Sequence, residues 1–149
     1  MSWVRNFIRL RWSEKLLFCE ALLLHLFVGL LLKVVPFRMI PRLFSGRQFE
    51  TPSETEDQSR RSVSGRQSEI VEKIRMAAQR AGAVSPWRNR CLVSSLSGRW
   101  MLNRRKISSE ISLGVTKQPD GKTIAHAWLI AAGYELVEKK GSYTEIYKF

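Results

Sequence analysis

The sequence predicts an α+β fold in which an N-terminal apolar helix precedes a small domain. In this domain a cysteine-bearing helix packs on an antiparallel sheet of three or four strands. An apolar run covers residues 16–37, and a second helical pattern of apolar residues starts at Cys91. Short runs that alternate apolar and polar residues follow, separated by turn residues, which is typical of strands with one buried face. The 149 residues have room for one such domain and an appended segment.

The composition limits the chemistry that this chain can perform. It contains only 2 cysteines and 2 histidines. These are too few for a disulfide framework or for a structural zinc site with four ligands. We therefore expect no metal and no cofactor, and any nucleophilic chemistry has very few candidate residues.

The charge is strongly basic, with 25 Lys and Arg against 13 Asp and Glu and a net charge of +12. Such a surplus attracts polyanions, which include nucleic acid, anionic lipid and acidic peptides. No basic run is longer than three residues, and no nucleic-acid-binding motif is present. We expect a peptide, a protein or a membrane surface as partner, and no nucleic acid.

Residues 1–46 are dominated by the apolar run. Ser13 is the predicted N-cap of a helix, which must end before Pro36 because proline cannot continue it. The 20 residues from 16 to 35 would just cross about 30 Å of hydrocarbon. Glu20 and Lys33 lie inside them, however, which favours a helix that docks on protein or lies at a membrane surface. Its basic flank would favour anionic lipid.

The remaining chain divides into a linker and a domain. Residues 47–68 are polar and rich in Ser, Glu and Arg, which predicts a flexible linker. The domain covers residues 69–149 and opens with a short helical pattern that ends at Gly82. A helix over residues 91–105 follows, and the turn at 119–121 joins the first two strands. The predicted strands lie near residues 111–115, 123–132, 134–138 and 143–149.

Cys91 is the candidate nucleophile. It lies in the first turn of its predicted helix, where unpaired backbone N–H groups and the positive end of the helix dipole stabilise a thiolate. Arg88 and Arg90 add positive charge close by in the sequence. The backbone N–H of Cys91 and a group just upstream, Asn89, form a candidate oxyanion hole. Cys19 lies inside the apolar helix, and we expect it to be structural.

His126 is the candidate general base, because it lies in the middle of the second predicted strand, where an imidazole can be held rigidly. A cysteine at a helix start followed by a histidine on a sheet is the layout of papain-like and transglutaminase-like thiol enzymes. An acid that orients the imidazole should come from the next strand. Glu138 is the first candidate, with Glu135 and Asp120 as alternatives. We expect His25, inside the apolar helix, to be structural.

Three stretches of the chain resemble the leader peptidase of lasso-peptide biosynthesis in its split form. The first is residues 16–46, with the apolar helix, a Pro-Phe-Arg sequence and a final glycine. The second is the Arg-Cys-Leu of residues 90–92, which opens a helix that ends in a basic triplet. The third, the most specific, is the Leu-Gly-Val of residues 113–115 followed by the Ala-His-Ala-Trp of residues 125–128.

The resemblance implies a transglutaminase-like cysteine protease that removes the leader from a ribosomally made precursor peptide. Cys91 and His126 match the Cys-His-Asp triad of the family, and Glu138 stands where the family has Asp. Other members carry a leader-recognition domain at the N-terminus, for which residues 1–46 have no room. The implied partners are the precursor peptide, a separate leader-recognition protein and an ATP-dependent cyclase, in the cytoplasm or at the inner face of the membrane.

Two other interpretations are compatible with the sequence. A transglutaminase-like enzyme could pass the acyl group to an amine instead of water, because the shape of the pocket decides the acceptor. The chain could also be a non-catalytic basic adaptor that binds a peptide or nucleic acid.

Overall fold

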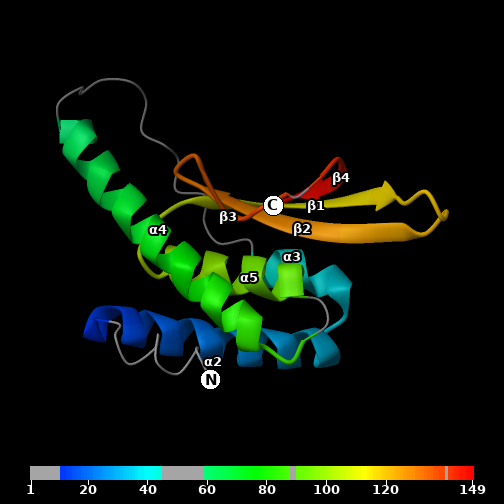
Figure 1. The fold of residues 1–149 in the computed structure, drawn as a ribbon, viewed down its shortest axis with the longest axis horizontal. Helices are drawn as coiled ribbons and strands as arrows, with labels where there is room; N and C mark the ends of the chain where they lie inside the picture. The colour runs from blue at the N-terminus through cyan, green and yellow to red at the C-terminus, as the bar shows by residue number, and fades with distance from the viewer. Residues whose placement is uncertain (1–10, 45–58, 88–89, 140) are drawn as a thin grey trace.

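The fold has its helices on one face of a four-stranded antiparallel sheet, which confirms the predicted α+β class (Figure 1). The computed structural model describes residues 11–44, 59–87, 90–139 and 141–149. Its helices are α2 (Trp12–Val34), the 3-10 helix η1 (Phe37–Met39), α3 (Ile40–Phe44), α4 (Ser59–Val84) and α5 (Arg90–Asn103). Its strands are β1 (Ser109–Lys117), β2 (Thr123–Ala131), β3 (Tyr134–Val137) and β4 (Thr144–Lys148), in the spatial order β3-β2-β1-β4. α5 lies between the sheet and α2, and α4 packs beside both helices.

Turn chemistry determines how β1, β2 and β3 pair. Gly121 has a φ of 82° between β1 and β2, and the Asp120 carboxylate accepts a hydrogen bond from the Lys122 N–H across this turn. Ala132 and Gly133 both have positive φ, 49° and 78°, as a two-residue turn between β2 and β3 requires. These turns explain why β1, β2 and β3 form close to the predicted residues.

α5 approaches the sheet closely because Gly98 has no side chain. A Cβ at this position would lie 2.8 Å from Cδ2 of Leu129 on β2. Leu96, Met101 and Leu102 of α5 are completely buried, as is Leu129. The tight packing of this helix on the sheet determines where the N-terminal end of α5 lies.

α2 belongs to the same core, although the sequence predicted an appended segment. It begins at Trp12 with Arg11 as N-cap and no side-chain capping bond, so Ser13 is not the cap that was predicted. Phe18, Ala21 and Val28 on its inner face are buried against α4 and α5. By length and composition α2 could cross a membrane, but in this structure one of its faces docks on protein.

Polar contacts connect α2 to the residues that directly follow α5 and to Trp87, which precedes α5 in the sequence. The Glu20 carboxylate pairs with Arg104 at 3.2 Å and with Arg105 at 2.7 Å. The indole N–H of Trp87 donates to the His25 carbonyl at 2.8 Å. Gly29 leaves room for this indole, because a Cβ there would lie 2.0 Å from the ring.

α4 begins at Ser59, so residues 59–68 are helical and not part of a flexible linker as predicted. The rest of the predicted linker, residues 47–58, lies outside the described part of the chain. The buried side chains of Val71, Ile74 and Ala78 hold the C-terminal half of α4 in the core. Because extending an existing helix costs far less than starting one, the polar segment before them can continue the helix.

His25 is structural, as predicted. Its side chain is completely buried, with Nδ1 2.8 Å from the Ala21 carbonyl and Nε2 3.0 Å from the Ser94 hydroxyl of α5. Because a carbonyl can only accept a hydrogen bond, Nδ1 carries the proton and Nε2 accepts from Ser94. Burial lowers the pKa of His25, and this outweighs the bond to Ala21, which raises it. The imidazole is therefore held in its neutral form.

The lowered pKa of His25 predicts that the protein loses stability in acid. Below the ordinary histidine pKa of 6.5 the unfolded chain binds a proton that the folded chain does not. The free energy of unfolding should therefore fall as the pH drops below 6.5 towards the lowered pKa. Urea unfolding between about pH 5 and pH 8 measures this slope. In His25→Gln the slope should be smaller, and an unchanged slope would assign the acid sensitivity to other groups.

Gly29→Ala tests the packing of α2 against Trp87. The added methyl group overlaps the indole, so the substitution should cost about 1–3 kcal/mol of unfolding free energy. Gly65→Ala is the matched control, because a Cβ at Gly65 of α4 meets nothing within 4 Å. Its effect should be a gain of about 0.5–1 kcal/mol from higher helix propensity. Equal effects of the two substitutions in urea unfolding would contradict this packing.

Candidate active site

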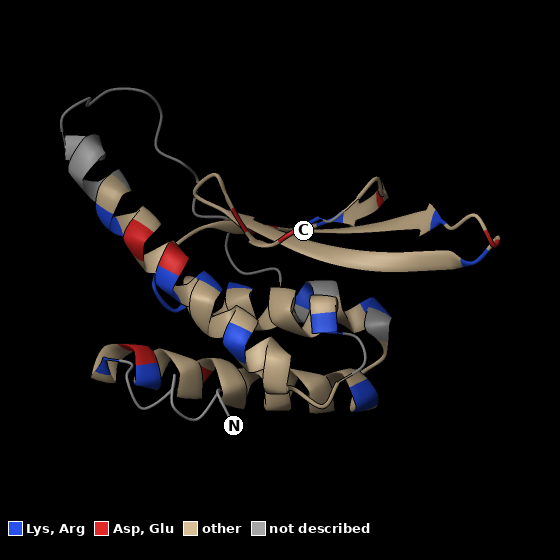
Figure 2. Cartoon of the chain, in the orientation of Figure 1, with Lys and Arg blue, Asp and Glu red and all other residues tan. Residues whose placement is uncertain are grey.

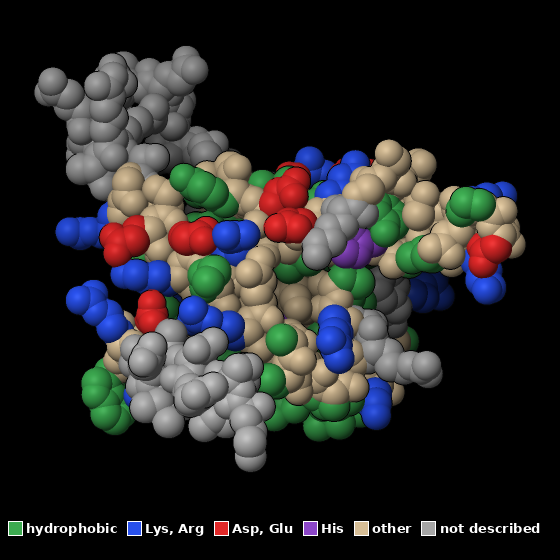
Figure 3. Space-filling view, in the orientation of Figure 1, with side chains coloured by type: hydrophobic (Ala, Val, Ile, Leu, Met, Phe, Trp, Pro, Cys, Tyr) green, Lys and Arg blue, Asp and Glu red, His purple; other side chains and the backbone are tan. Residues whose placement is uncertain are grey.

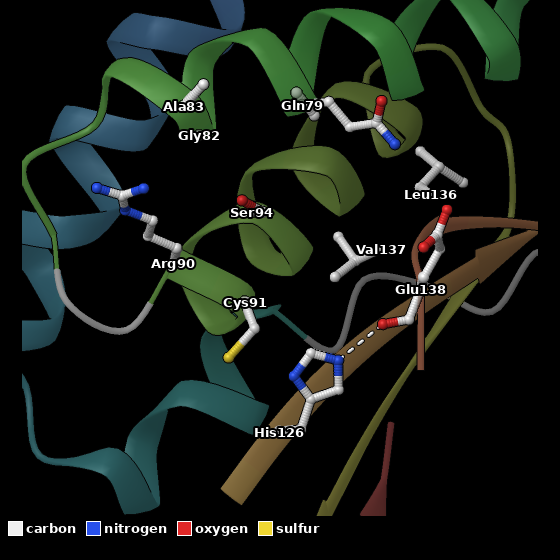
Figure 4. A pocket seen from close by; sticks show the side chains of 11 residues that line it. Gln79, Gly82, Ala83, Arg90, Cys91, Ser94, His126, Leu136, Val137 and Glu138 are labelled. Carbon is white, nitrogen blue, oxygen red and sulfur yellow. Dashed lines mark hydrogen bonds between the residues drawn. The ribbon is translucent and has the colours of Figure 1, made fainter. Parts of the chain in front are cut away.

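Cys91 lies at the mouth of a pocket between the start of α5, α4 and the end of β3 (Figure 4). It is the second residue of α5, and its side chain is half-buried. The pocket has a volume of about 450 Å³, which is in the range of ligand sites. Its lining residues are Ala78, Gln79, Gly82, Ala83, Arg90, Cys91, Ser94, His126, Leu136, Val137 and Glu138.

His126 of β2 faces Cys91 across this pocket. Its Nε2 lies 2.7 Å from the main-chain carbonyl oxygen of Glu138. The other ring nitrogen, Nδ1, is on the side that faces Cys91 (Figure 4). Because the carbonyl only accepts, Nε2 carries the proton of the neutral ring and Nδ1 is left as an acceptor. The imidazole thus has the tautomer that a base for the Cys91 thiol requires.

Aromatic side chains hold the ring of His126 in place. Tyr143 stacks on it with ring centroids 5.0 Å apart and an interplanar angle of 28°. Trp128 lies beside both rings, at 6.4 Å from each centroid. Two stacked neighbours and one hydrogen bond leave the imidazole little rotational freedom, as proton transfer requires.

The pairing of β1 with β2 explains why the two most specific motifs occur together. Gly114 pairs directly with His126 in the sheet. A Cβ at Gly114 would lie 2.9 Å from the Trp128 ring, so only glycine lets this indole lie over β1. The Leu-Gly-Val motif therefore creates the space that the Trp of the His-containing motif fills.

Glu138 meets His126 through its main chain, whereas the sequence predicted its carboxylate. The carboxylate instead lies 4.0 Å from the Arg75 guanidinium of α4. The reason is local, because β3 ends at Val137 and the chain that leaves it turns the next carbonyl towards the ring. Sequence spacing places a residue beside the histidine but does not determine which of its groups points there.

The two alternative acids lie outside the pocket. Asp120 is in the turn between β1 and β2, where it pairs with Lys122 at 3.1 Å. The Glu135 carboxylate lies 3.4 Å from the Lys139 backbone N–H. Asn89, the candidate for the oxyanion hole, falls outside the described residues. Cys19 is exposed on α2 and away from the residues that line this pocket.

Sequence reasoning missed Ser94, which connects the pocket to the core. It lies three residues after Cys91, lines the same pocket, and bonds to the buried His25. Helical spacing from Cys91 was a signal that could have found it. The sequence carried no comparable signal for Tyr143, because its place beside His126 depends on how β4 pairs with β1.

The geometry places a thiol, an imidazole with a free acceptor nitrogen, and a group that orients it around one pocket. Within the described ranges, no group of three or more His, Cys, Asp or Glu could hold a metal ion. The arrangement suits acyl transfer through a cysteine.

Comparison with known proteins agrees with this chemistry. No curated protein and no solved structure matches the chain significantly. The family model described as transglutaminase-like superfamily matches residues 31–148, which include the last turn of α2, the whole pocket and all four strands. The chain therefore belongs to the transglutaminase-like superfamily, whose members are in general cysteine peptidases or acyltransferases.

Proposed function

We propose that this protein is a cysteine peptidase that removes the leader from a ribosomally made lasso-peptide precursor. The observation that carries the peptidase part is the Cys91–His126 pair, with the imidazole held by the Glu138 carbonyl in a superfamily of thiol enzymes. The lasso-peptide part rests on the resemblance of residues 90–92, 113–115 and 125–128 to leader peptidases.

The reaction uses the two ring nitrogens of His126 in different ways. Nδ1 takes the proton of the Cys91 thiol as Sγ attacks the scissile carbonyl carbon. The imidazolium then gives this proton to the leaving amine, and the leader remains bound to Sγ as a thioester. Water attacks the thioester while Nδ1 takes its proton, and the leader leaves as a free acid with the thiol restored. The Glu138 carbonyl keeps the Nε2–H bond throughout.

The start of α5 supplies a donor for the oxyanion. The first four N–H groups of a helix have no carbonyl partner within it, so the N–H of Cys91 is available to the developing negative charge. We propose Asn89 as the source of a second donor.

The pocket walls suit an extended peptide with a small or apolar side chain next to the scissile bond. Ala78, Gly82 and Ala83 of α4 leave room on one side, and Leu136 and Val137 form an apolar wall on the other. We propose that a separate leader-recognition protein delivers the precursor to this open pocket in the cytoplasm. An ATP-dependent cyclase would then join the new amine to an acidic side chain.

The decisive experiment is a reconstitution of the purified chain with a precursor peptide and its recognition protein. Mass spectrometry of the products distinguishes the possible functions. A leader with a free carboxyl end supports a peptidase, and a leader joined to an added amine supports acyl transfer. Intact precursor under all conditions would support a non-catalytic adaptor.

Cys91→Ala should remove the activity. Without Sγ there is no acyl-enzyme, so the rate of leader removal should fall by about 10³-fold or more. Cys19→Ala is the matched control, because Cys19 is exposed and away from the pocket, and it should leave the rate unchanged. Leader cleavage by the Cys91→Ala protein at the normal rate would rule out the proposed mechanism.

Glu138→Gln tests whether the main-chain carbonyl or the side-chain carboxylate of Glu138 orients His126. The substitution keeps the main-chain carbonyl that holds His126, so the loss in kcat should be less than about tenfold. Loss of an orienting carboxylate would cost on the order of 10⁴-fold instead. Glu135→Gln is the control with the same change of charge outside the pocket. A loss in kcat on the order of 10⁴-fold would show instead that the Glu138 carboxylate orients the imidazole during turnover.

A further inference from the structure

The outer face of α2 is an apolar surface that the rest of the described chain leaves largely exposed, although Phe27 at its edge contacts the Trp100 ring of α5. Figure 1 shows α2 at the base of the molecule with α4 and α5 above it, and Figure 3 shows hydrophobic side chains along this lower edge. Leu23 is 68% exposed, Leu30 58% and Val34 76%. The residues recur every three or four positions, as on one side of a helix. We name this surface the outer face of α2, made of Trp12, Leu16, Cys19, Leu23, Leu26, Phe27, Leu30 and Val34.

Two lysines lie along one edge of this face. Lys15 and Lys33 are 18 residues apart, which is five helical turns, and the Lys33 ammonium lies 5.1 Å from the centroid of the Trp87 ring beside this edge. Between Glu20 and Lys33 the helix carries no Asp, Glu, Lys or Arg, and Figure 2 shows its middle turns in tan. Exposed Arg38 and Arg42 follow just beyond its end.

Neither acidic residue of α2, Glu14 or Glu20, lies on the outer face. Glu20 lies to the side and is bound by Arg104 and Arg105. Glu14 lies on the opposite side of the helix by its spacing from Leu23 and Leu30. The surface is therefore apolar in the middle and positive at its margin.

The inner face of α2 prevents the helix from crossing a bilayer while the domain is folded. His25 on this face bonds to Ser94 of α5, and the His25 carbonyl accepts from Trp87. A span would expose these polar groups to lipid and remove Ala21 and Val28 from the core. An orientation parallel to a surface leaves every one of these contacts intact.

We propose that the outer face of α2 docks on the surface of an anionic lipid bilayer. The helix then lies in the plane of the interface with its apolar side chains among the acyl chains and Lys15 and Lys33 at the level of the phosphates. The pocket stays accessible, because α5 and the sheet lie on the far side of α2 (Figure 1). This proposal is independent of the proposed peptidase function.

Flotation of the full chain with lipid vesicles tests the docking. Vesicles of phosphatidylcholine containing about 30% phosphatidylglycerol should bind at least about tenfold more protein than phosphatidylcholine alone, and the excess should fall with added salt. Equal binding to both vesicles, or no binding to either, would overturn the proposal.

A matched pair of variants localises the contact. Leu23→Glu combined with Leu30→Glu should reduce binding at least about tenfold. Ile146→Glu is the control, because Ile146 of β4 is 63% exposed but lies on the sheet, and it should change binding less than about twofold. Equal losses would overturn the assignment to α2. Light scattering on the chain without vesicles tests whether a second copy of the chain binds this face instead. A dimer that the double variant converts to a monomer would show that it does, and would overturn the proposal.

The charged border and the depth of insertion have tests that leave the exposed leucines of the outer face unchanged. Lys15→Gln with Lys33→Gln should abolish the preference for phosphatidylglycerol, whereas Lys117→Gln with Lys122→Gln, at the turn between β1 and β2, should keep it. An environment-sensitive dye on Cys19 in a Cys91→Ser background should shift its emission to the blue when anionic vesicles are added. An unchanged emission would mean that the outer face stays in water and would overturn the proposal.

Discussion

The packing of α5 between α2 and the sheet is the constraint on which the rest of the structure depends. On one side Gly98 lets the helix approach Leu129, and on the other Ser94 bonds to the buried His25 of α2. Neither contact involves Cys91 itself, yet together they determine the position of the N-terminal turn that carries it. Since the candidate nucleophile is part of a rigid helix, α2 supports the candidate active site even though its own residues do not line the pocket.

The candidate base, His126, is held by a different kind of contact. Tyr143 and Trp128 confine the imidazole of His126 by stacking, and the Glu138 carbonyl selects its tautomer. A neutral carbonyl orients a ring as well as a carboxylate does, but it stabilises the imidazolium less because it brings no full negative charge.

The sequence was sufficient for features that depend on local chemistry. The strands, the turn at Gly121 and the end of α2 before Pro36 follow from alternation, glycine and proline, and the structure has them near the expected residues. It was insufficient where the outcome depends on distant contacts. The helical start of α4 depends on the buried side chains of Val71, Ile74 and Ala78, which lie further along the chain. The roles of Ser94 and of the Glu138 carbonyl depend on which groups the folded chain turns towards one another.

The environment of α2 is another feature that the sequence alone does not determine. Its sequence is apolar around the whole helix, so periodicity alone could not separate a core helix from a membrane helix. The structure divides the helix into two faces, one of which packs on α4 and α5. A helix that only had to pack on this domain would carry polar residues on its other face, because leucines in water add nothing to folding. The outer leucines are therefore the part of α2 that its packing on the described domain does not explain, and this is the observation on which the proposed docking to an anionic surface rests.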